Sequence, residues 1–500
     1  MFRSLATAAA LAAALAGCSL APAYERPASP VASLWPSGPG GRAQPAAATA
    51  GRPTADIGWR DFFQDPRLRE LIQTALDHSR DLRVAALNVE TARAQYQIEA
   101  AGLLPRIDAT GGATMQRTPA RLSQRGRATT SQSYDVGLGL TAWEIDLFGR
   151  VRSLQAAALE SYFALDETRT ATQIALVAQV ADAYLTLLAD AQLLRLTRET
   201  LASQRQSFEL TRASFERGVA TELDLRQVET SMRTAETNIS VYARRLALAR
   251  NALELLTGRP LPDGFMDAIG DGSDLDRQAL LADLPAGLPS DLLTRRPDIR
   301  AAEHDLRAAN ANIGAARAAF FPRITLTAGL GTASTSLGGL FDGAARTWSF
   351  LPSISVPIFD AGANQANLDV AEVRRRIQVA NYEKAIQTAF SEVADALAER
   401  ATYDTQLRSQ EALVAASEQS YRLADLRYRS GIDSYLATLV NQRALYQAQQ
   451  ELIQTRLARL ANLVTLYKVL GGGWSATTTA GPPAAAPVPP GALATVGIGR

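Results

Sequence analysis

The chain has little of the chemistry on which enzymes and disulfide-stabilised proteins depend. It contains one cysteine and two histidines, and aromatic residues make up 6% of its 500 residues. A single thiol excludes an internal disulfide, and neither a nucleophile-and-base arrangement nor a Gly-x4-Gly-Lys-Ser/Thr phosphate loop occurs. Lys and Arg number 51 against 50 Asp and Glu, so no basic surface points to nucleic acid. We expect no enzyme activity, cofactor, metal site or nucleic-acid partner.

The amino terminus has the features of a secretory leader. A charged start, Met1-Phe2-Arg3, precedes an Ala/Leu stretch that is too short to span a membrane and ends in Leu15-Ala16-Gly17-Cys18. These last residues resemble the bacterial lipobox, in which the cysteine becomes the first mature residue and receives lipid. The alternative is an ordinary signal peptide with an incidental Cys18. Ser19 follows the cysteine, and for bacterial lipoproteins this implies the outer membrane.

The composition of the two ends defines the outer segments of the chain. We predict a signal peptide over 1–17 and a lipidated, weakly ordered tether rich in Pro and Ala over 18–56. The Ala/Pro-rich segment 475–500 is expected to be a disordered tail.

The chain between these ends carries the same plan twice. Gly102-Leu103-Leu104-Pro105-Arg106-Ile107 returns as Ala319-Phe320-Phe321-Pro322-Arg323-Ile324, and the segment Phe215 to Leu223 returns as Tyr428 to Leu436. The copies are about 215 residues apart, far more than the spacing of solenoid repeats. We therefore predict two structural repeats, 57–258 and 288–474, joined by a linker over 259–287.

Helical periodicity dominates each repeat. It extends from about Arg150 to Thr257 and from about Ala361 to Leu470, and the only plausible break in each block is Gly218 or Gly431. Each block therefore predicts a hairpin of helices of about 65 and 35 residues. Two apolar seams suit coiled-coil-like packing: Ile174, Val177, Ala178, Ala181, Tyr184, Leu185 and Leu188 in the first block, and Val370, Val373, Ile377 and Ala380 in the second.

Four segments replace this periodicity with strict alternation. They are strands expected at about 105–116, 133–143, 322–332 and 347–358, each with one apolar face and one small, polar face. Their length is close to the roughly 9 to 11 residues of a tilted transmembrane strand. An ordinary half-buried soluble sheet is the alternative. Because four strands cannot close a barrel, and an open edge in lipid leaves backbone groups unpaired, several chains would have to share one barrel.

The order of several motifs resembles the lipoprotein branch of the TolC-like outer-membrane factors that serve resistance-nodulation-division (RND) efflux pumps. The matching segments are Ala21 to Pro27, Trp59 to Leu68, Trp143 to Arg150, Arg295 to Arg300 and Leu466 to Trp474. The resemblance implies a mainly α fold with a membrane β-barrel: duplicated halves, a long antiparallel α-helical barrel, and four transmembrane strands per chain in a 12-stranded barrel shared by a trimer. It also implies an inner-membrane RND-type pump, a periplasmic adaptor and outer-membrane lipid as partners.

The resemblance also implies roles for particular residues. The hairpin tips would contact the adaptor through Gly218, Val219, Thr221 and Leu223 in one repeat and Gly431, Ile432, Ser434 and Leu436 in the other. Thr221 and Ser434 can also serve simply as helix caps. Candidates for a periplasmic gate are Asp425, Arg427, Arg429 and Asp433, whose charges could form rings around a symmetry axis. A solvated helix surface is the alternative for these four residues.

The resemblance implies an outer-membrane exit duct for drugs or other small toxic compounds, and the lack of an ATP site predicts that this duct is passive. Two alternatives stay open. One is an exit duct for type I protein secretion. The other is a lipid-anchored periplasmic scaffold of coiled-coil hairpins without a pore, which leaves the four strands without a purpose.

Overall fold

The computed structural model describes residues 19–36, 53–124, 126–270, 273–278, 280–281, 284–287 and 289–478. The chain divides into two compact units. The first unit comprises Met1–Ala28, Ala86–Glu167 and Arg300–Ala385, and the second comprises Ser29–Ala85, Thr168–Ile299 and Ile386–Arg500. Each unit takes corresponding parts of both sequence repeats, so the units cut across the predicted duplication.

Four helices contribute to the first unit. They are α4 (Arg80–Ala101) and α9 (Pro297–Ala318), together with the first parts of the two long helices, α5 (Arg150–Glu216) and α10 (Ala363–Arg429). Alanine fills many of the buried positions, since its small side chain lets neighbouring helices approach closely. The buried alanines are Ala92, Ala157, Ala164, Ala301, Ala308, Ala318 and Ala371.

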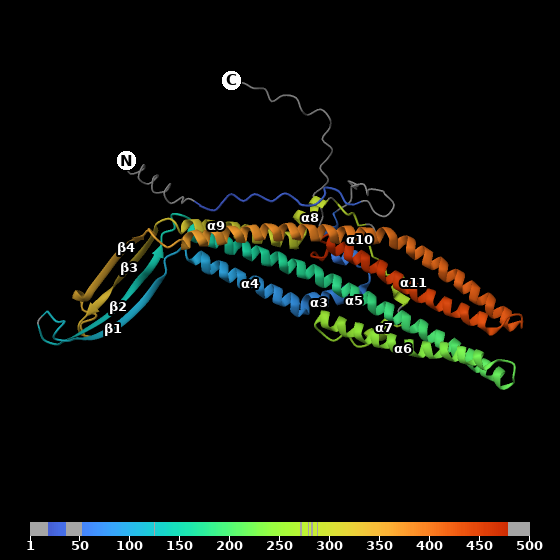
Figure 1. Ribbon diagram of the computed structural model, residues 1–500. Helices are drawn as coiled ribbons and strands as arrows, with labels where there is room; N and C mark the ends of the chain where they lie inside the picture. The colour runs from blue at the N-terminus through green and yellow to red at the C-terminus, as the bar shows by residue number, and fades with distance from the viewer. Residues whose placement is uncertain are drawn as a thin grey trace, which may run out of the picture. The chain divides into compact units, whose positions relative to one another are not determined.

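The rest of the first unit is one antiparallel sheet in the order β1-β2-β3-β4 (Figure 1). Its strands are β1 (Ile107–Thr118), β2 (Thr129–Glu144), β3 (Arg323–Ser334) and β4 (Arg346–Ser355), with the short helix η3 (Gly343–Ala345) before β4. A β-bulge lies between Leu140 and Trp143 of β2. Since β1 and β4 each pair on one side only, both edges of the sheet are open.

The strand bounds differ most from the predicted ones in two places, the free end of the β1–β2 hairpin and the end of β4. The β1–β2 ladder continues to Thr118 and Thr129 because Thr, Ser and Gln go on pairing there, although they carry no apolar alternation. Val356 and Ile358 lie beyond β4, which ends at Ser355. The proline between them, Pro357, has no backbone N–H to donate to the ladder.

Large apolar side chains on the sheet alternate with small or polar ones, as the period-two pattern predicts. Leu138, Leu330 and Trp348 stand on one face and are exposed, Trp348 to 79%. Asp135, Gly137 and the strand residues that pair with them occupy the opposite face. The chain itself therefore leaves the apolar face of its sheet uncovered, which marks a surface for lipid or for a partner.

The second unit is built mainly from the remaining parts of the long helices and from α6 (Glu222–Thr257) and α11 (Tyr435–Val469). Shorter elements complete it: η1 (Thr54–Asp56), α2 (Trp59–Phe62), α3 (Pro66–His78), α7 (Phe265–Ile269), η2 (Ser273–Arg277) and α8 (Pro289–Arg295). Figure 1 shows α6 returning beside α5 and α11 returning beside α10, as the two predicted hairpins require.

The carboxyl-terminal part of the second unit is a tightly packed aromatic core. The ring of Tyr467 stacks on Phe62 with centroids 4.1 Å apart, and its hydroxyl donates to the carbonyl oxygen of Ile57 at 2.6 Å. Burial raises the pKa of Tyr467. A Cβ on Gly472 would overlap the ring atoms of Tyr467, so only glycine fits there.

The predicted apolar seams have different outcomes. The first is confirmed, because all seven of its residues, from Ile174 to Leu188, are buried. An 18-residue window of α5 is apolar enough for a membrane span, but 72% of it is buried, as in a core helix. The second seam is not buried: Val370, Val373 and Ile377 on α10 remain 43 to 52% exposed. The described residues of one chain therefore leave about half of each of these three side chains uncovered.

The predicted tail and tether are more ordered near their folded ends than expected. The carbonyl oxygens of Ser475 and Ala476 accept hydrogen bonds from the backbone N–H groups of Trp59 and Arg60. Thr478 bonds to Asp61. The rest of the predicted tail, 479–500, lies outside the described residues, as does the predicted signal peptide.

Candidate functional site

The first hairpin tip joins α5 to α6. Gly218 has a φ of +75° that favours glycine, and Val219 donates its backbone N–H to the carbonyl oxygen of Ser214 at 2.9 Å. Thr221 then caps α6: its hydroxyl accepts from the backbone N–H of Asp224, and the Asp224 carboxylate accepts from the backbone N–H of Thr221. This capping box stabilises the start of the returning helix.

The second tip repeats this turn with one difference. Gly431 has a φ of +70°, and Ile432 donates its backbone N–H to the carbonyl oxygen of Arg427 at 2.9 Å. Ser434 occupies the N-cap position of α11, but its side chain makes no capping hydrogen bond. The residue three positions on is Ala437, which has no carboxylate to complete a capping box and whose N–H already bonds to the Ser434 carbonyl oxygen. The expectation of a side-chain cap is therefore wrong for Ser434.

The two tips expose apolar side chains. Val219 is 80% exposed and Leu223 65% at the first tip, and Ile432 and Leu436 are also exposed at the second. Both tips belong to the second unit, and Figure 1 shows that they lie at the same end of this unit. Such apolar residues on a tight, hydrogen-bonded turn can contact a partner while the turn itself stays folded.

The four gate candidates form two ion pairs within the chain. Arg427 donates two hydrogen bonds to Asp433, at 2.6 and 3.0 Å, and Arg429 lies 2.9 Å from Asp425 one helical turn away. The hydrogen bond from Arg427 lowers the pKa of Asp433 below its usual value. The Arg427–Asp433 pair thus fastens the last turn of α10 to the turn that follows it.

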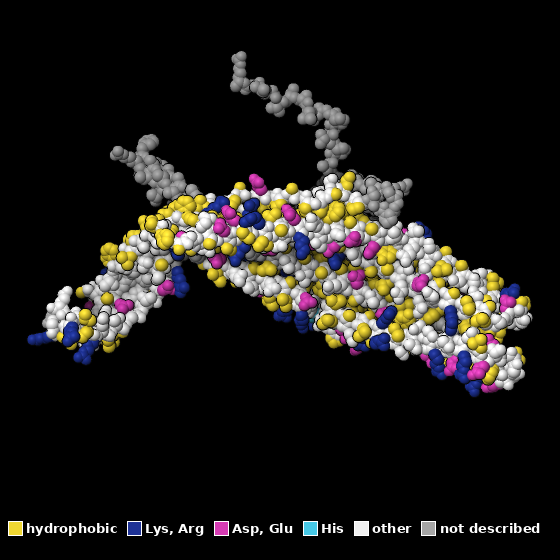
Figure 2. Space-filling model, viewed as in Figure 1, with side chains coloured by type: hydrophobic (Ala, Val, Ile, Leu, Met, Phe, Trp, Pro, Cys, Tyr) yellow, Lys and Arg dark blue, Asp and Glu magenta, His cyan; other side chains and the backbone are white. Residues whose placement is uncertain are grey.

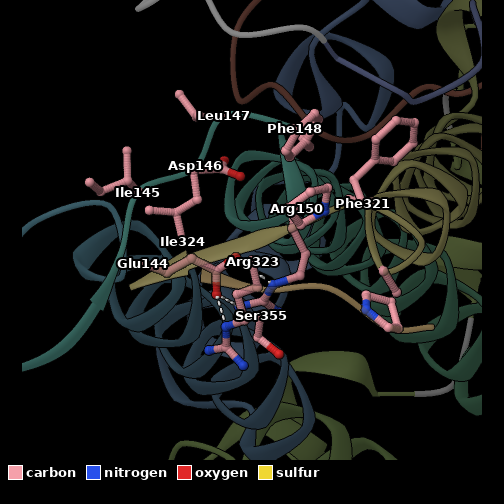
Figure 3. Close-up of a pocket in the computed structure, with 14 residues that line it drawn as sticks. Glu144, Ile145, Asp146, Leu147, Phe148, Arg150, Phe321, Arg323, Ile324 and Ser355 are labelled. Atoms are coloured by element: carbon pink, nitrogen blue, oxygen red, sulfur yellow. Dashed lines mark hydrogen bonds and ion pairs between the residues drawn. The ribbon is translucent and has the colours of Figure 1, made fainter. Parts of the chain in front are cut away.

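A separate cluster lies in the first unit, where β2 ends and α5 begins. The carboxylate of Glu144 receives hydrogen bonds from Arg150 at 2.9 and 2.7 Å and lies 2.7 Å from Arg323 of β3 (Figure 3). Hydrogen bonding to Glu144 raises the pKa of Arg150. Glu144 is largely buried, so one carboxylate fixes the ends of two strands to the start of α5.

The same junction is reinforced around a hollow of about 270 Å³. The rings of Phe148 and Phe321 stack with centroids 4.8 Å apart, and the Asp146 carboxylate accepts from the backbone N–H of Arg152 at 2.9 Å. The residues that line the hollow offer paired charges and apolar walls but no nucleophile with a base. No metal-binding group of His, Cys, Asp or Glu occurs among the described residues. We interpret this junction as a structural contact that holds the ends of β2 and β3 against the start of α5.

The amino-terminal segment 19–28 is extended along α9 and is not loose. Glu303 on α9 accepts hydrogen bonds from the Tyr24 hydroxyl at 3.1 Å and from Arg26 at 2.9 to 3.1 Å. Burial alone would raise the pKa of Glu303, but its hydrogen bonds and opposite charges, chiefly those of Arg26, outweigh it and lower that pKa. Arg307 bonds to the same carboxylate and lies over the Tyr24 ring.

This contact continues toward the sheet end of α9. Asn310 donates to the carbonyl oxygen of Pro22 at 2.7 Å, and Arg317 donates to that of Leu20 at 3.4 Å. Ala21 lies so close to Gly314 that a Cβ there would come within 2.8 Å of it. Cys18 itself lies outside the described residues, two positions before Leu20.

Both clusters were missed as sites by sequence reasoning. Glu144 and Arg150 stand in a motif that carried the family resemblance, and Arg323 stands in the repeated segment Ala319 to Ile324. The period-two pattern says nothing about charges at strand ends. Tyr24 and Arg26 were assigned to a loose tether because Pro/Ala composition hides their contact with Glu303, 277 residues from Arg26. The available signal was that Tyr24 and Arg26 lie within the Ala21 to Pro27 motif.

An open sheet with an exposed apolar face, joined to long helical hairpins, is characteristic of an outer-membrane channel protein. The family model "Outer membrane efflux protein" matches residues 71–259 and 288–472. The chain belongs to this family. It is therefore an outer-membrane efflux protein of the Gram-negative type, with a membrane sheet and helices that extend into the periplasm.

Curated relatives and a solved structure agree with this assignment. The toluene efflux pump outer membrane protein TtgC and the antibiotic efflux pump outer membrane protein ArpC, both from Pseudomonas putida, are each 51% identical over 474 residues. Each match covers 95% of this chain and 96% of the relative. The open-state MtrE outer membrane channel of Neisseria gonorrhoeae is 39% identical, with a TM-score of 0.83, over 93% of this chain and 100% of that one. The predicted resemblance to the TolC-like outer-membrane factors, the predicted fold class and the predicted localisation in the outer membrane are confirmed.

Proposed function

We propose that three copies of the chain form the passive exit duct of a tripartite efflux pump. The observation that carries this proposal is the four-stranded sheet with open edges at β1 and β4 and an uncovered apolar face. In lipid, unpaired edge groups cost several kcal/mol each, so the edges must pair between chains. Three chains supply twelve strands, and the exposed α10 seam at Val370, Val373 and Ile377 offers a helical contact for the same symmetry.

Small toxic compounds are the cargo that the comparisons favour. The names of two relatives specify toluene and antibiotic efflux, and neither names a secreted protein. Since the chain has no phosphate-binding loop, the energy for transport comes from an inner-membrane pump, of the RND type, that delivers substrate through a periplasmic adaptor. The duct itself only conducts.

The proposal is tested by deletion and replacement in a host that lacks its own exit duct. We expect the chain, expressed with a cognate pump and adaptor, to raise the minimal inhibitory concentration of toluene-like solvents or antibiotics severalfold. A pump and adaptor without the chain are the control. Unchanged susceptibility with the chain present in the outer membrane would refute the efflux role.

We propose the two tips as the adaptor contact. Their support is the exposure of Val219, Leu223, Ile432 and Leu436 on rigid turns. Gly431→Val should impair efflux while leaving membrane insertion intact, because a β-branched residue is strained at the φ of +70° found there. Gly338→Val in the β3–β4 turn, where a Cβ meets open space, is the matched control. Wild-type resistance from Gly431→Val would remove the tips from the adaptor contact.

We propose Asp425, Arg427, Arg429 and Asp433 as the periplasmic gate. The support is that both ion pairs hold the end of α10 at the tip. The double variant Asp425→Ala/Arg429→Ala should increase conductance in planar bilayers. Arg212→Ala/Glu216→Ala removes a similar one-turn pair at the end of α5 and is the control. Equal conductance in the wild type and the gate variant would exclude this pair from gating.

We propose that Cys18 carries lipid. Its support is the path of the mature segment, since Leu20 is bonded to Arg317 near the end of α9, where the chain turns into β3. An acyl chain two residues earlier would thus enter the membrane beside the strands. Metabolic labelling with palmitate should mark the wild type and not Cys18→Ser. Labelling of the variant, or a mature mass without acyl groups, would refute the anchor.

A further inference from the structure

Positive charge is concentrated at the outer end of the sheet. Residues 114–133, which form the free end of the β1–β2 hairpin, contain four arginines and no acidic residue, although the whole chain is nearly neutral. Of these four, the structure describes Arg117, Arg121 and Arg127, and all three are exposed. Figure 2 shows Lys and Arg side chains gathered over this end of the hairpin.

The strand register places two arginines on the apolar face of the sheet. Arg117 follows Ile107, Ala113 and Met115 at two-residue spacing on β1, and Ala113 pairs with Tyr134. On β4, Arg346 precedes Trp348 and Phe350 in the same way. Because paired residues share a face, Arg117 and Arg346 point to the side that faces lipid, not into the lumen.

Strand length places both arginines at the outer margin of the hydrocarbon layer. A tilted strand crosses that layer in about 9 to 11 residues. Counting from Ile107 at the helix end of β1, the eleventh residue is Arg117, and counting from Ser355 at the helix end of β4, the tenth is Arg346.

The stagger of the strands puts the two arginines at a similar depth. Across the sheet, Arg346 pairs with Thr332, Thr332 with Val136, and Val136 with Gly111. Gly111 comes six residues before Arg117 on β1. At the inner end, Ile107 aligns with Phe350, five residues before Ser355. A stagger that is nearly the same at both ends is what strand tilt in a barrel requires.

These arginines lack acidic partners. Among the described residues, no hydrogen bond or ion pair involves the side chain of Arg117, Arg121, Arg127 or Arg346. Between 331 and 348 the one acidic residue is Asp342, and Asp135 lies on the opposite face of β2. Exposed apolar side chains stand beside the charges, including Leu122 at 78% and Phe341 at 79%. The surface thus combines free guanidinium groups with apolar side chains at a lipid boundary.

We propose that Arg117, Arg121, Arg127 and Arg346, the outer arginine cluster, bind the phosphate groups of the phosphorylated glycolipid in the outer leaflet. A guanidinium donates two parallel hydrogen bonds to a phosphate and loses less hydration energy than an ammonium does. The pairs lie at the edge of the apolar layer, where the dielectric constant is lower than in bulk water and each pair gains strength. Meanwhile Leu122 and Phe341 contact the acyl and sugar parts of the same lipid.

The test uses the purified, detergent-solubilised full-length protein and fluorescent deep-rough lipopolysaccharide, with its dephosphorylated form as the second ligand. We expect the wild type to bind the phosphorylated glycolipid at least tenfold more tightly than the dephosphorylated form. The variant R117Q/R121Q/R127Q/R346Q should lose most of this difference. The corresponding Arg→Lys variant should keep part of it, because the charge remains and the bidentate geometry is lost.

Two controls separate binding from folding. R198Q/R244Q/R408Q/R422Q removes the same charge from exposed positions on the helices and should bind as the wild type does. Bilayer conductance of the cluster variant reports that the sheet still assembles. Equal affinity of the wild type for both glycolipids, or undiminished preference in the cluster variant, would overturn the proposal. Competition by free inorganic phosphate as strong as that by the glycolipid would overturn the assignment to lipid.

Discussion

At the residue scale, Asp182 is an acidic group within the buried apolar seam of α5. One of its carboxylate oxygens is buried and has no hydrogen-bond partner among the residues that the structure describes. Burial raises its pKa to about 6, against a weaker opposing effect of Lys468. The folded protein therefore holds a proton on Asp182 at pH values at which the unfolded chain has released it.

This difference predicts a pH-dependent effect of Asp182→Asn. Between the ordinary pKa of 3.8 and about 6, the folded state binds more protons, so stability falls as pH rises and stays reduced above pH 6. The variant should gain up to about 3 kcal/mol at pH 7.5, from about two pKa units at about 1.4 kcal/mol each, and nothing near pH 3.5. Thermal unfolding in detergent measures this, with the exposed Asp263→Asn as control. A gain that does not depend on pH would contradict it.

Gly472 tests the aromatic core at the same scale. In Gly472→Ala the new methyl group would overlap the Tyr467 ring, which is itself stacked on Phe62. We expect a loss of about 1 to 3 kcal/mol, the usual cost of overpacking. Gly338→Ala, at a position with open space, should change little. Chemical denaturation compares the two variants. Equal midpoints would show that the core accommodates the extra methyl group without loss of stability.

At the scale of elements, the two hairpin tips differ in how their returning helices begin. Thr221→Ala should destabilise the first turn of α6 by about 1 kcal/mol because it removes a capping box. Ser434→Ala should leave α11 nearly unchanged, since Ser434 makes no side-chain capping bond. Hydrogen exchange of the two first turns distinguishes these outcomes. Similar acceleration in both variants would mean that the tips are capped alike.

The strand-to-helix junction is the other element whose strength can be measured. Glu144→Gln keeps the shape of the side chain but leaves Arg150 and Arg323 without their shared anion. Because both guanidiniums are partly exposed, we expect a loss of about 1 to 2 kcal/mol in thermal unfolding. Adding Arg323→Gln should cost less in the Glu144→Gln background than in the wild type. Additive losses would show that the two side chains act independently.

At the scale of the whole molecule, periodicity alone predicted the long helices, the positions of the hairpin tips at Gly218 and Gly431, and the alternating strands. It could not predict the Glu303 contact with Tyr24 and Arg26, because that contact joins segments almost 280 residues apart and has no local pattern. It also could not tell where the packing partner of the Val370 seam lies. A seam has the same period whether its partner is in the same chain or in another one.

The central claim is that chains pool their strands into one hollow barrel, since four strands with an uncovered apolar face cannot close alone in lipid. The most direct test is the mass of the detergent-solubilised protein, measured by light scattering with correction for bound detergent. The account predicts three chains per particle. A stable single chain, with no larger species at any protein concentration, would contradict it.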